Sequence, residues 1–195
     1  MTRTNNMTPP SSTIITADNM NSGTQEFMAT LAGVAVEEYD KLLGSYQQDL
    51  VKINDQKTEL RKDRDTISKM QNRGVLSNQA LKEGEPPVEG RTIDSKDFGS
   101  ADKPGDAAFY LNKYGVEQTA YSKTSDGKYF IPDSVWENMK EKIDDKIQNS
   151  NSTSEIKMIY FQALMDSRKQ AMLMLSNMIT SENSTKMAII QNLKG

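Results

Sequence analysis

Apolar residues from about Gln25 to Asn72 recur with alternating steps of four and three, which places them on one face of a helix. The stretch has no proline, so it predicts one uninterrupted helix over residues 25–73. Two seam positions carry Lys57 and Arg64, and this incomplete seam favours pairing with another helix of the same chain over a free-standing dimer. The predicted coiled-coil seam consists of Tyr39, Leu43, Tyr46, Leu50, Ile53, Leu60 and Ile67.

The character of the chain changes over residues 74–105, where glycine and proline become frequent. The Pro86-Pro87 pair and Pro104 lie in this stretch, which predicts a connector between structured elements.

Residues 106–150 carry the signals of a small α+β subdomain. A short helix is expected from about Asp106 to Lys113, ending at Gly115. The Asp126-Gly127 dipeptide separates two runs with aromatic residues, 119–123 and 128–131, and this pattern predicts a β-hairpin.

Residues 133–194 contain neither glycine nor proline and favour helix throughout. Two capping boxes, Ser134 to Glu137 and Ser152 to Glu155, divide the stretch into two predicted helices. The first would bury Trp136 and its helical neighbours, and the second, over residues 151–195, would pair with the first long helix of the chain.

The last helix is more apolar than one buried face requires, since seven of the nine residues 171–179 are apolar. Either this segment is fully buried in a compact core, or part of it is exposed and covered by neighbours in an assembly. The second reading is favoured because the chain offers one other long helix, and flexible methionines suit surfaces that repack. The candidate assembly residues are Leu173, Leu175, Met178, Ile179, Met187, Ile189, Ile190 and Leu193.

These patterns together predict a mainly α fold, an elongated coiled coil of two long helices with a small α+β subdomain of short helices and a β-hairpin between them. Composition narrows the chemistry further. The chain has no histidine and no cysteine, so imidazole bases, thiolate nucleophiles and the usual zinc ligands are excluded. A formal net charge of -3 leaves no basic surplus for a phosphate backbone, so nucleic acid is not an expected partner. No enzyme, metal site or cofactor is expected.

Residues 1–24 are rich in Ser, Thr and Asn, and their longest apolar run is Ile14-Ile15. A secretory leader needs an apolar core of about 7 to 15 residues, so this is no signal peptide. The segment is expected to be disordered. It is either a plain terminus or a signal read by an export machine outside the general secretory route.

The order of these elements resembles the hydrophilic needle-tip proteins of type III secretion systems, the IpaD, SipD and BipD group. The most specific likeness lies in residues 175–181 and 190–195, which look like the C-terminal helix of that family. Residues 136–149 and the Asp126-Gly127 hairpin fall where the family has matching elements. The likeness covers residues 30–195 in layout.

The chain also departs from that family. Needle-tip proteins are longer and carry an N-terminal helical hairpin that covers the coiled coil before secretion. In size this chain is nearer the EspA and SseB filament subunits of related machines. The lack of a self-covering hairpin implies a separate cytoplasmic secretion chaperone.

The resemblance implies a secreted, non-catalytic protein located at the needle tip on the bacterial surface. It would cap the needle and serve as the platform for the pore-forming translocators. The implied partners are the needle subunit, copies of itself, the translocator proteins, the chaperone, and in some members the host membrane or a bile salt. Two alternatives remain open, a secreted filament subunit like EspA or SseB and a tip sensor for an amphipathic ligand such as a bile salt. Tyr39, Tyr46 and Tyr160 are expected in the core, not in a ligand groove.

Overall fold

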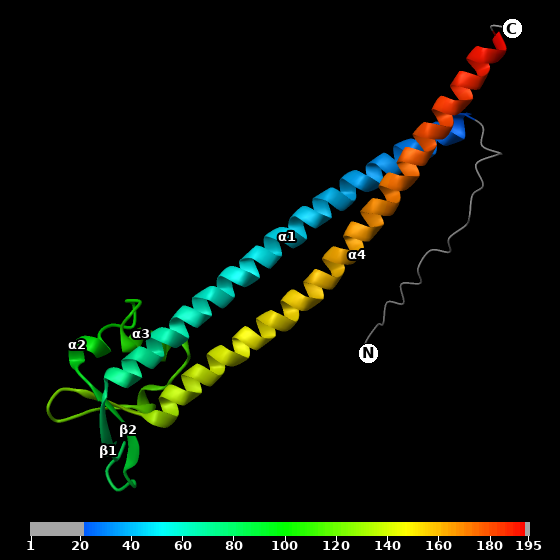
Figure 1. Ribbon diagram of the computed structural model, residues 1–195. Helices are drawn as coiled ribbons and strands as arrows, with labels where there is room; N and C mark the ends of the chain where they lie inside the picture. The colour runs from blue at the N-terminus through cyan, green and yellow to red at the C-terminus, as the bar shows by residue number, and fades with distance from the viewer. Residues whose placement is uncertain (1–21, 194–195) are drawn as a thin grey trace. The chain divides into compact units, whose positions relative to one another are not determined.

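Two long helices dominate the computed structural model, which describes residues 22–193 (Figure 1). Helix α1 spans Ser22–Arg73 and helix α4 spans Asp133–Leu193, so the mainly helical class and the first predicted helix are confirmed. The N-terminal export signal predicted over residues 1–24 lies almost entirely outside the described residues.

The chain divides into two units. The helical unit joins the part of α1 up to Gly44 to the part of α4 that begins at Gln162, and the mixed unit runs from Ser45 to Phe161. Within each unit α1 packs against α4 in antiparallel orientation, as ion pairs between Asp40 and Arg168 and between Asp49 and Lys157 record.

The division of residues 133–194 into two helices was wrong, because α4 is a single helix of 61 residues. The second capping box lies inside it. Hydroxyl groups around that box bond back along the helix: Ser150 Oγ donates to the carbonyl of Lys146 at 2.8 Å, and Thr153 Oγ1 donates to that of Asn149 at 2.9 Å. These hydroxyl groups therefore bond to carbonyls of the preceding turn and do not cap the start of a new helix.

Seam residues of α1 face inward in the mixed unit, as the heptad pattern predicted. Ile53 and Ile67 are buried, while Tyr46, Leu50 and Leu60 are half-buried. Tyr160, expected in the core, is exposed instead, although its ring lies 6.4 Å from that of Tyr46.

Residues 74–105 were predicted to be a connector, and this was wrong in part. They contain strand β1 (Val75–Gln79), strand β2 (Val88–Ile93) and the short helix α2 (Ser95–Phe98). The corner between α1 and β1 needs glycine, because a Cβ on Gly74 would lie 2.8 Å from Cβ of Arg91.

The strands form one antiparallel sheet in the order β1-β2-β4-β3. The predicted hairpin is confirmed as β3 (Ser122–Lys123) and β4 (Tyr129–Pro132), whose register pairs Ser122 with Phe130. In the centre of the sheet Gly90 pairs with Pro132, and a Cβ there would meet the ring of Phe130 at 2.7 Å. The missing side chain of Gly90 thus leaves room for a buried aromatic ring on the next strand.

The remaining short elements are helix α3 (Ala107–Lys113), which confirms the predicted helix, and the 3-10 turn η2 (Gln118–Ala120). They cover a core in which Trp136, Met139 and Ile143 of α4 are fully buried, as predicted. The indole N–H of Trp136 has no hydrogen-bond partner among residues 22–193. The other buried members of this core are Ile67, Met70, Ile93, Phe98, Ala107, Tyr110, Leu111, Tyr114 and Ile131.

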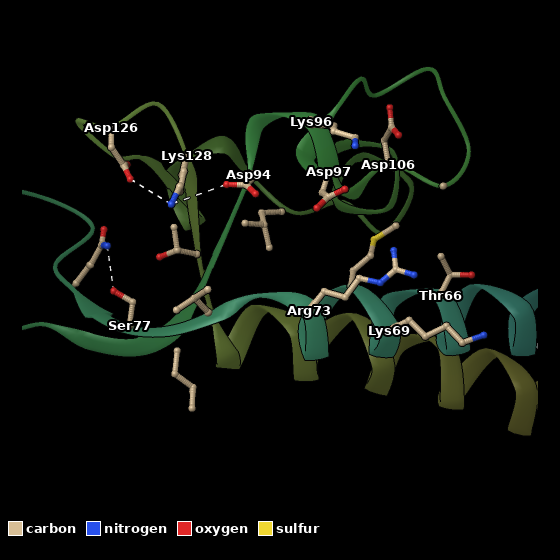
Figure 2. Close-up of a pocket in the computed structure, with 17 residues that line it drawn as sticks. Thr66, Lys69, Arg73, Ser77, Asp94, Lys96, Asp97, Asp106, Asp126 and Lys128 are labelled. Atoms are coloured by element: carbon tan, nitrogen blue, oxygen red, sulfur yellow. Dashed lines mark hydrogen bonds and ion pairs between the residues drawn. The ribbon is translucent and has the colours of Figure 1, made fainter.

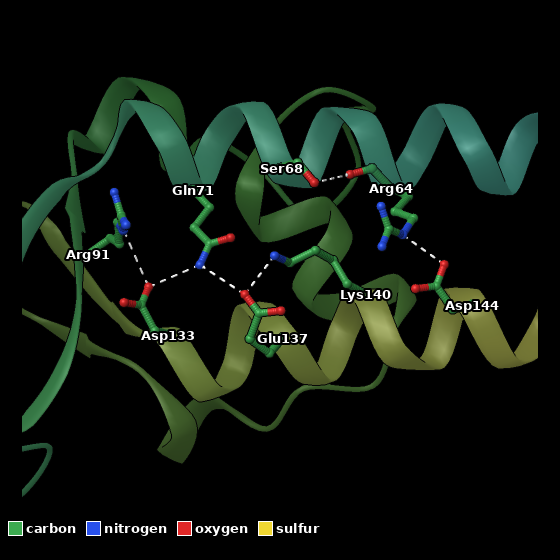
Figure 3. A network of polar contacts seen from close by, with 8 residues as sticks. All are labelled: Arg64, Ser68, Gln71, Arg91, Asp133, Glu137, Lys140 and Asp144. Carbon is green, nitrogen blue, oxygen red and sulfur yellow. Dashed lines mark hydrogen bonds and ion pairs between the residues drawn. The ribbon is translucent and has the colours of Figure 1, made fainter.

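A polar network joins the end of α1 to the start of α4 (Figure 3). The buried amide of Gln71 donates to Oδ1 of Asp133 at 3.1 Å and to Oε1 of Glu137 at 3.3 Å. Arg91 from β2 reaches the same oxygen of Asp133 at 3.4 Å, and Lys140 pairs with Glu137 at 2.6 Å. One amide thus bridges two carboxylates whose charges are balanced by two cations, which fixes the helices against the sheet.

Candidate functional site

The inner side of the helical unit is a seam between α1 and α4. Ala32 and Leu43 are buried there, and Tyr39 is half-buried. Arg168 of α4 forms a bidentate pair with the carboxylate of Asp40, its Nη2 lying 3.4 Å from Oδ2. Hydrogen bonding to this carboxylate raises the pKa of Arg168 above its usual range. The pair shows which face of α4 lies against α1 in this unit.

Leu175 and Met178 belong to this inner face. They follow Arg168 at steps of seven and ten residues, which returns a helix to the same side. Both are half-buried. Of the predicted assembly residues, these two therefore lie mainly against α1.

The other six predicted assembly residues are exposed. Leu193, near the end of α4, is 81% exposed. Because Asp40 lies level with Arg168 in an antiparallel pair, Ser22 lies level with about residue 186, so the last residues of α4 have no described α1 residue beside them. Their role in assembly stays a prediction. The exposed residues are Leu173, Ile179, Met187, Ile189, Ile190 and Leu193.

A second apolar stripe on α4 was not among the assembly residues predicted from the sequence. Met165, Met172 and Ile179 are all exposed and are spaced seven residues apart. This spacing keeps side chains in line along a helix that packs against another helix. The repeat was visible in the sequence, but the choice of candidates followed the density of apolar residues and missed Met165 and Met172.

Helix α1 carries exposed apolar residues of its own. Phe27, Leu31 and Val34 are spaced by four and three residues and are each more than half exposed. They share one face, whereas Ala32 lies on the seam. Each helix of this unit therefore presents apolar side chains outside the contact with the other.

A hollow of about 460 Å³ in the mixed unit lies between the end of α1 with β1 and the opposite wall formed by α2 and the β3–β4 turn (Figure 2). Its wall carries charges of both signs. Lys128 is 3.9 Å from Asp94 and 3.6 Å from Asp126, whereas the side chains of Arg73 and Asp97 have no ion pair among the described residues. Figure 2 shows these two side chains reaching into the hollow from opposite walls.

An ionic cluster around the buried carboxylate of Asp63 holds the end of α3 on α1. The carboxylate of Asp63 accepts hydrogen bonds from Tyr114 Oη at 2.6 Å and from Lys113 Nζ at 2.7 Å, and Lys113 also reaches Glu59 at 3.1 Å. Burial lowers the pKa of Lys113, but its bonds to the two carboxylates more than offset this and raise it. Burial, together with the bond to Asp63, raises the pKa of Tyr114 well above its usual range.

Beside this cluster lies a second hollow of about 400 Å³, between α1 and α4. Leu60 forms an apolar part of its wall, Lys113 and Lys146 supply positive charge, and Glu59, which pairs with Lys113, supplies negative charge.

Among residues 22–193 no group of three or more acidic side chains is arranged to hold a metal ion. Within the same residues, no helix combines the length and apolarity needed to span a bilayer. Comparisons with protein-family models, curated proteins and solved structures found no match.

Proposed function

We propose that this protein is a secreted, non-catalytic assembly subunit of a bacterial type III secretion needle, acting as its tip protein and as the platform for the pore-forming translocators. The observation that carries the proposal is the apolar surface that α1 and α4 each present outside their mutual seam. The sequence likeness of residues 175–181 and 190–195 to needle-tip proteins supplies the class of machine.

The exposed apolar surface favours assembly on energetic grounds. Burying one large apolar side chain contributes about 1.5 to 3 kcal/mol. Covering Met165, Met172 and Ile179 in a neighbour's groove would therefore contribute several kcal/mol, and leaving such a stripe in water is costly. The regular spacing supports a long helical partner.

The seam between α1 and α4 is proposed to be a true coiled coil. Its residues repeat every three or four positions through both units, and burial follows the same period in each. Knob-into-hole packing along that seam would leave the outer stripes free for the needle subunit, further copies and the translocators. A cytoplasmic chaperone would cover them before export.

The test replaces Met187, Ile190 and Leu193 together by serine. These exposed side chains contribute little to folding, so secretion should persist while recovery of the protein at the needle tip on whole bacteria fails. The matched control, Val51→Ser, removes an apolar residue that is equally exposed but lies on α1 in the mixed unit, and should leave tip recovery unchanged.

Two outcomes would overturn the proposal. A fall in melting temperature of more than about 10 °C would mean that the three residues are ordinary core, since a chain of this size loses about 2 to 4 °C per kcal/mol. Normal tip recovery with normal stability would leave this surface without the assigned role.

A filament subunit like EspA or SseB is the second candidate, because the same exposed surfaces are compatible with it. The stripe on α1 and the stripe on α4 are different surfaces, and contact between unlike surfaces yields a closed ring or an open filament depending on the rotation between copies. Electron microscopy of the purified protein separates the two, because a filament subunit lengthens into fibres with concentration and a tip protein stops at a small ring.

A tip sensor for an amphipathic anion is a third possibility, favoured by the hollow that Leu60, Lys113 and Lys146 line. Deoxycholate is a suitable probe. Binding seen by calorimetry that disappears in Lys146→Gln but not in Lys186→Gln would support this function, and no binding at millimolar concentration would reject it.

A further inference from the structure

Strand β1 is an open edge of the sheet. Within the described chain it pairs with β2 on one side only, in a continuous register from Val75–Thr92 to Gln79–Val88. The opposite edge, β3, has two residues and ends at Lys123, so it offers little backbone to a partner.

The usual protections of an edge strand are missing from β1. Its sequence, Val-Leu-Ser-Asn-Gln, has no charged residue, no proline and no bulge in its register. Val75 and Leu76 are 69% and 60% exposed. In Figure 1 the β1–β2 hairpin projects away from the neighbouring helix ends of its own unit. An edge of this kind is a template for a further strand.

We propose that β1 pairs in antiparallel orientation with β1 of a second copy of this chain, across a twofold axis at Ser77. In that register Ser77 faces Ser77 of the second copy, and Val75 faces Gln79 of the second copy. Two four-stranded sheets become one sheet of eight strands. The proposal stands independently of the function proposed above.

The lack of charge on β1 favours a second copy over an unlike partner that carries charge on its pairing strand. An uncharged strand can face itself without placing like charges opposite each other, as a strand carrying lysine could not.

The absence of cysteine from the chain allows a direct test. Residues opposite each other in an antiparallel pair have Cα atoms about 4.5 to 5.5 Å apart, which suits a disulfide. The full-length Ser77→Cys protein should therefore form a disulfide-linked dimer at least about tenfold faster than Ser122→Cys on the other edge or Glu89→Cys on β2. Equal rates for the three variants would overturn the proposal. Circular dichroism checks that each cysteine variant is folded.

A further variant separates pairing through β1 from assembly through the long helices. Replacing Met165, Met172 and Ile179 by serine in the Ser77→Cys protein removes the outer stripe of α4 but leaves β1 intact. Cross-linking should continue at an unchanged rate. Its loss would show that the β1 contact follows from helical assembly and has no affinity of its own, against the proposal.

Discussion

Tyr114 donates a hydrogen bond of 2.6 Å to the buried carboxylate of Asp63, linking the residue after α3 to α1 across 51 positions of sequence. Lys142 of α4 donates to the carbonyl of the same tyrosine at 2.9 Å. The aromatic residue thus connects three helices, and its ring also lies 5.3 Å from the ammonium of Lys146.

Replacing Asp63 by asparagine should lower the free energy of unfolding by about 1 to 3 kcal/mol. The change removes the charge of a buried carboxylate that accepts hydrogen bonds from both Tyr114 and Lys113, and hydrogen bonds to charged groups contribute more than those between neutral groups. Urea denaturation followed by circular dichroism measures the effect. Asp65→Asn is the matched control, because its pair with Lys69 is exposed on the same helix and should contribute less than about 1 kcal/mol. Equal losses in both variants would contradict the importance of burial.

Stability should decline as the pH rises above about 10. Unfolded tyrosine ionises near pH 10, whereas the raised pKa of Tyr114 keeps the folded hydroxyl protonated, so the unfolded state is increasingly favoured above that pH. Lys113 acts in the same direction, because its raised pKa contributes stability that is present below about pH 10.4 and is lost as the folded lysine deprotonates.

Urea titrations between about pH 8 and pH 11 test this. Each group contributes at most about 1.4 kcal/mol per pH unit. Tyr114→Phe should be less stable at pH 8, yet its stability should fall less steeply toward pH 11. An unchanged slope in that variant would show that Tyr114 does not ionise differently in the two states.

Gln71→Glu places a third carboxylate beside Asp133 and Glu137, where the wild-type amide donates to both. We expect a loss of about 2 to 4 kcal/mol at pH 7. The introduced carboxyl would have a raised pKa when folded, so its destabilising effect should shrink as the pH falls from 7 toward about 4 and be absent below that pH. Gln56→Glu, an exposed change on the same helix, controls for added charge. A loss that is independent of pH would point to a packing defect instead.

Ile53→Asp should cost about 3 kcal/mol or more, because it buries an unpaired charge in the seam of the mixed unit. Val51→Asp, two residues away on the exposed side of α1, should cost less than about 1 kcal/mol. Hydrogen exchange measures the effect, since the amides of residues 133–161 of α4 should lose protection together with those of α1. Retained protection in α4 would show that the two helices fold independently there.

The parts of the fold that sequence alone predicted are those whose signal is local and repeated. The seam of α1 recurs over five heptads, so Ile53 and Ile67 were identified as inward-facing without knowledge of their partner. The β3–β4 hairpin is specified by Asp126-Gly127, where Gly127 has the positive φ of 82° that the turn requires.

The β1–β2 strand pair was not predicted, because it is favoured by contacts with distant parts of the chain and not by a local sequence pattern. Val75-Leu76 is followed by three polar residues, which shows no alternation, and Gly90 in the middle of β2 argues locally against a strand. That glycine is favoured because the ring of Phe130 and the backbone of Ile131 and Pro132, all on β4, occupy the space that a Cβ would need. The residues around Gly90 in the sequence give no indication of such a neighbour.

The candidate site was predicted in part for a similar reason. The density of apolar residues identified the end of α4, but it could not separate Leu175 and Met178, which face α1, from Met165 and Met172, which face away. That separation depends on the orientation of α4, which the pair between Asp40 and Arg168 reveals.

Trp136 is the single tryptophan of the chain and is fully buried in the core of the mixed unit. Its intrinsic fluorescence is therefore a built-in reporter for that unit alone, with a blue-shifted emission that moves to longer wavelength when water enters the core. Far-ultraviolet circular dichroism, by contrast, averages over α1 and α4 along their whole length. Recording both signals during one thermal melt would show whether the helical unit loses its structure at the same temperature as the mixed unit, with no label and no substitution.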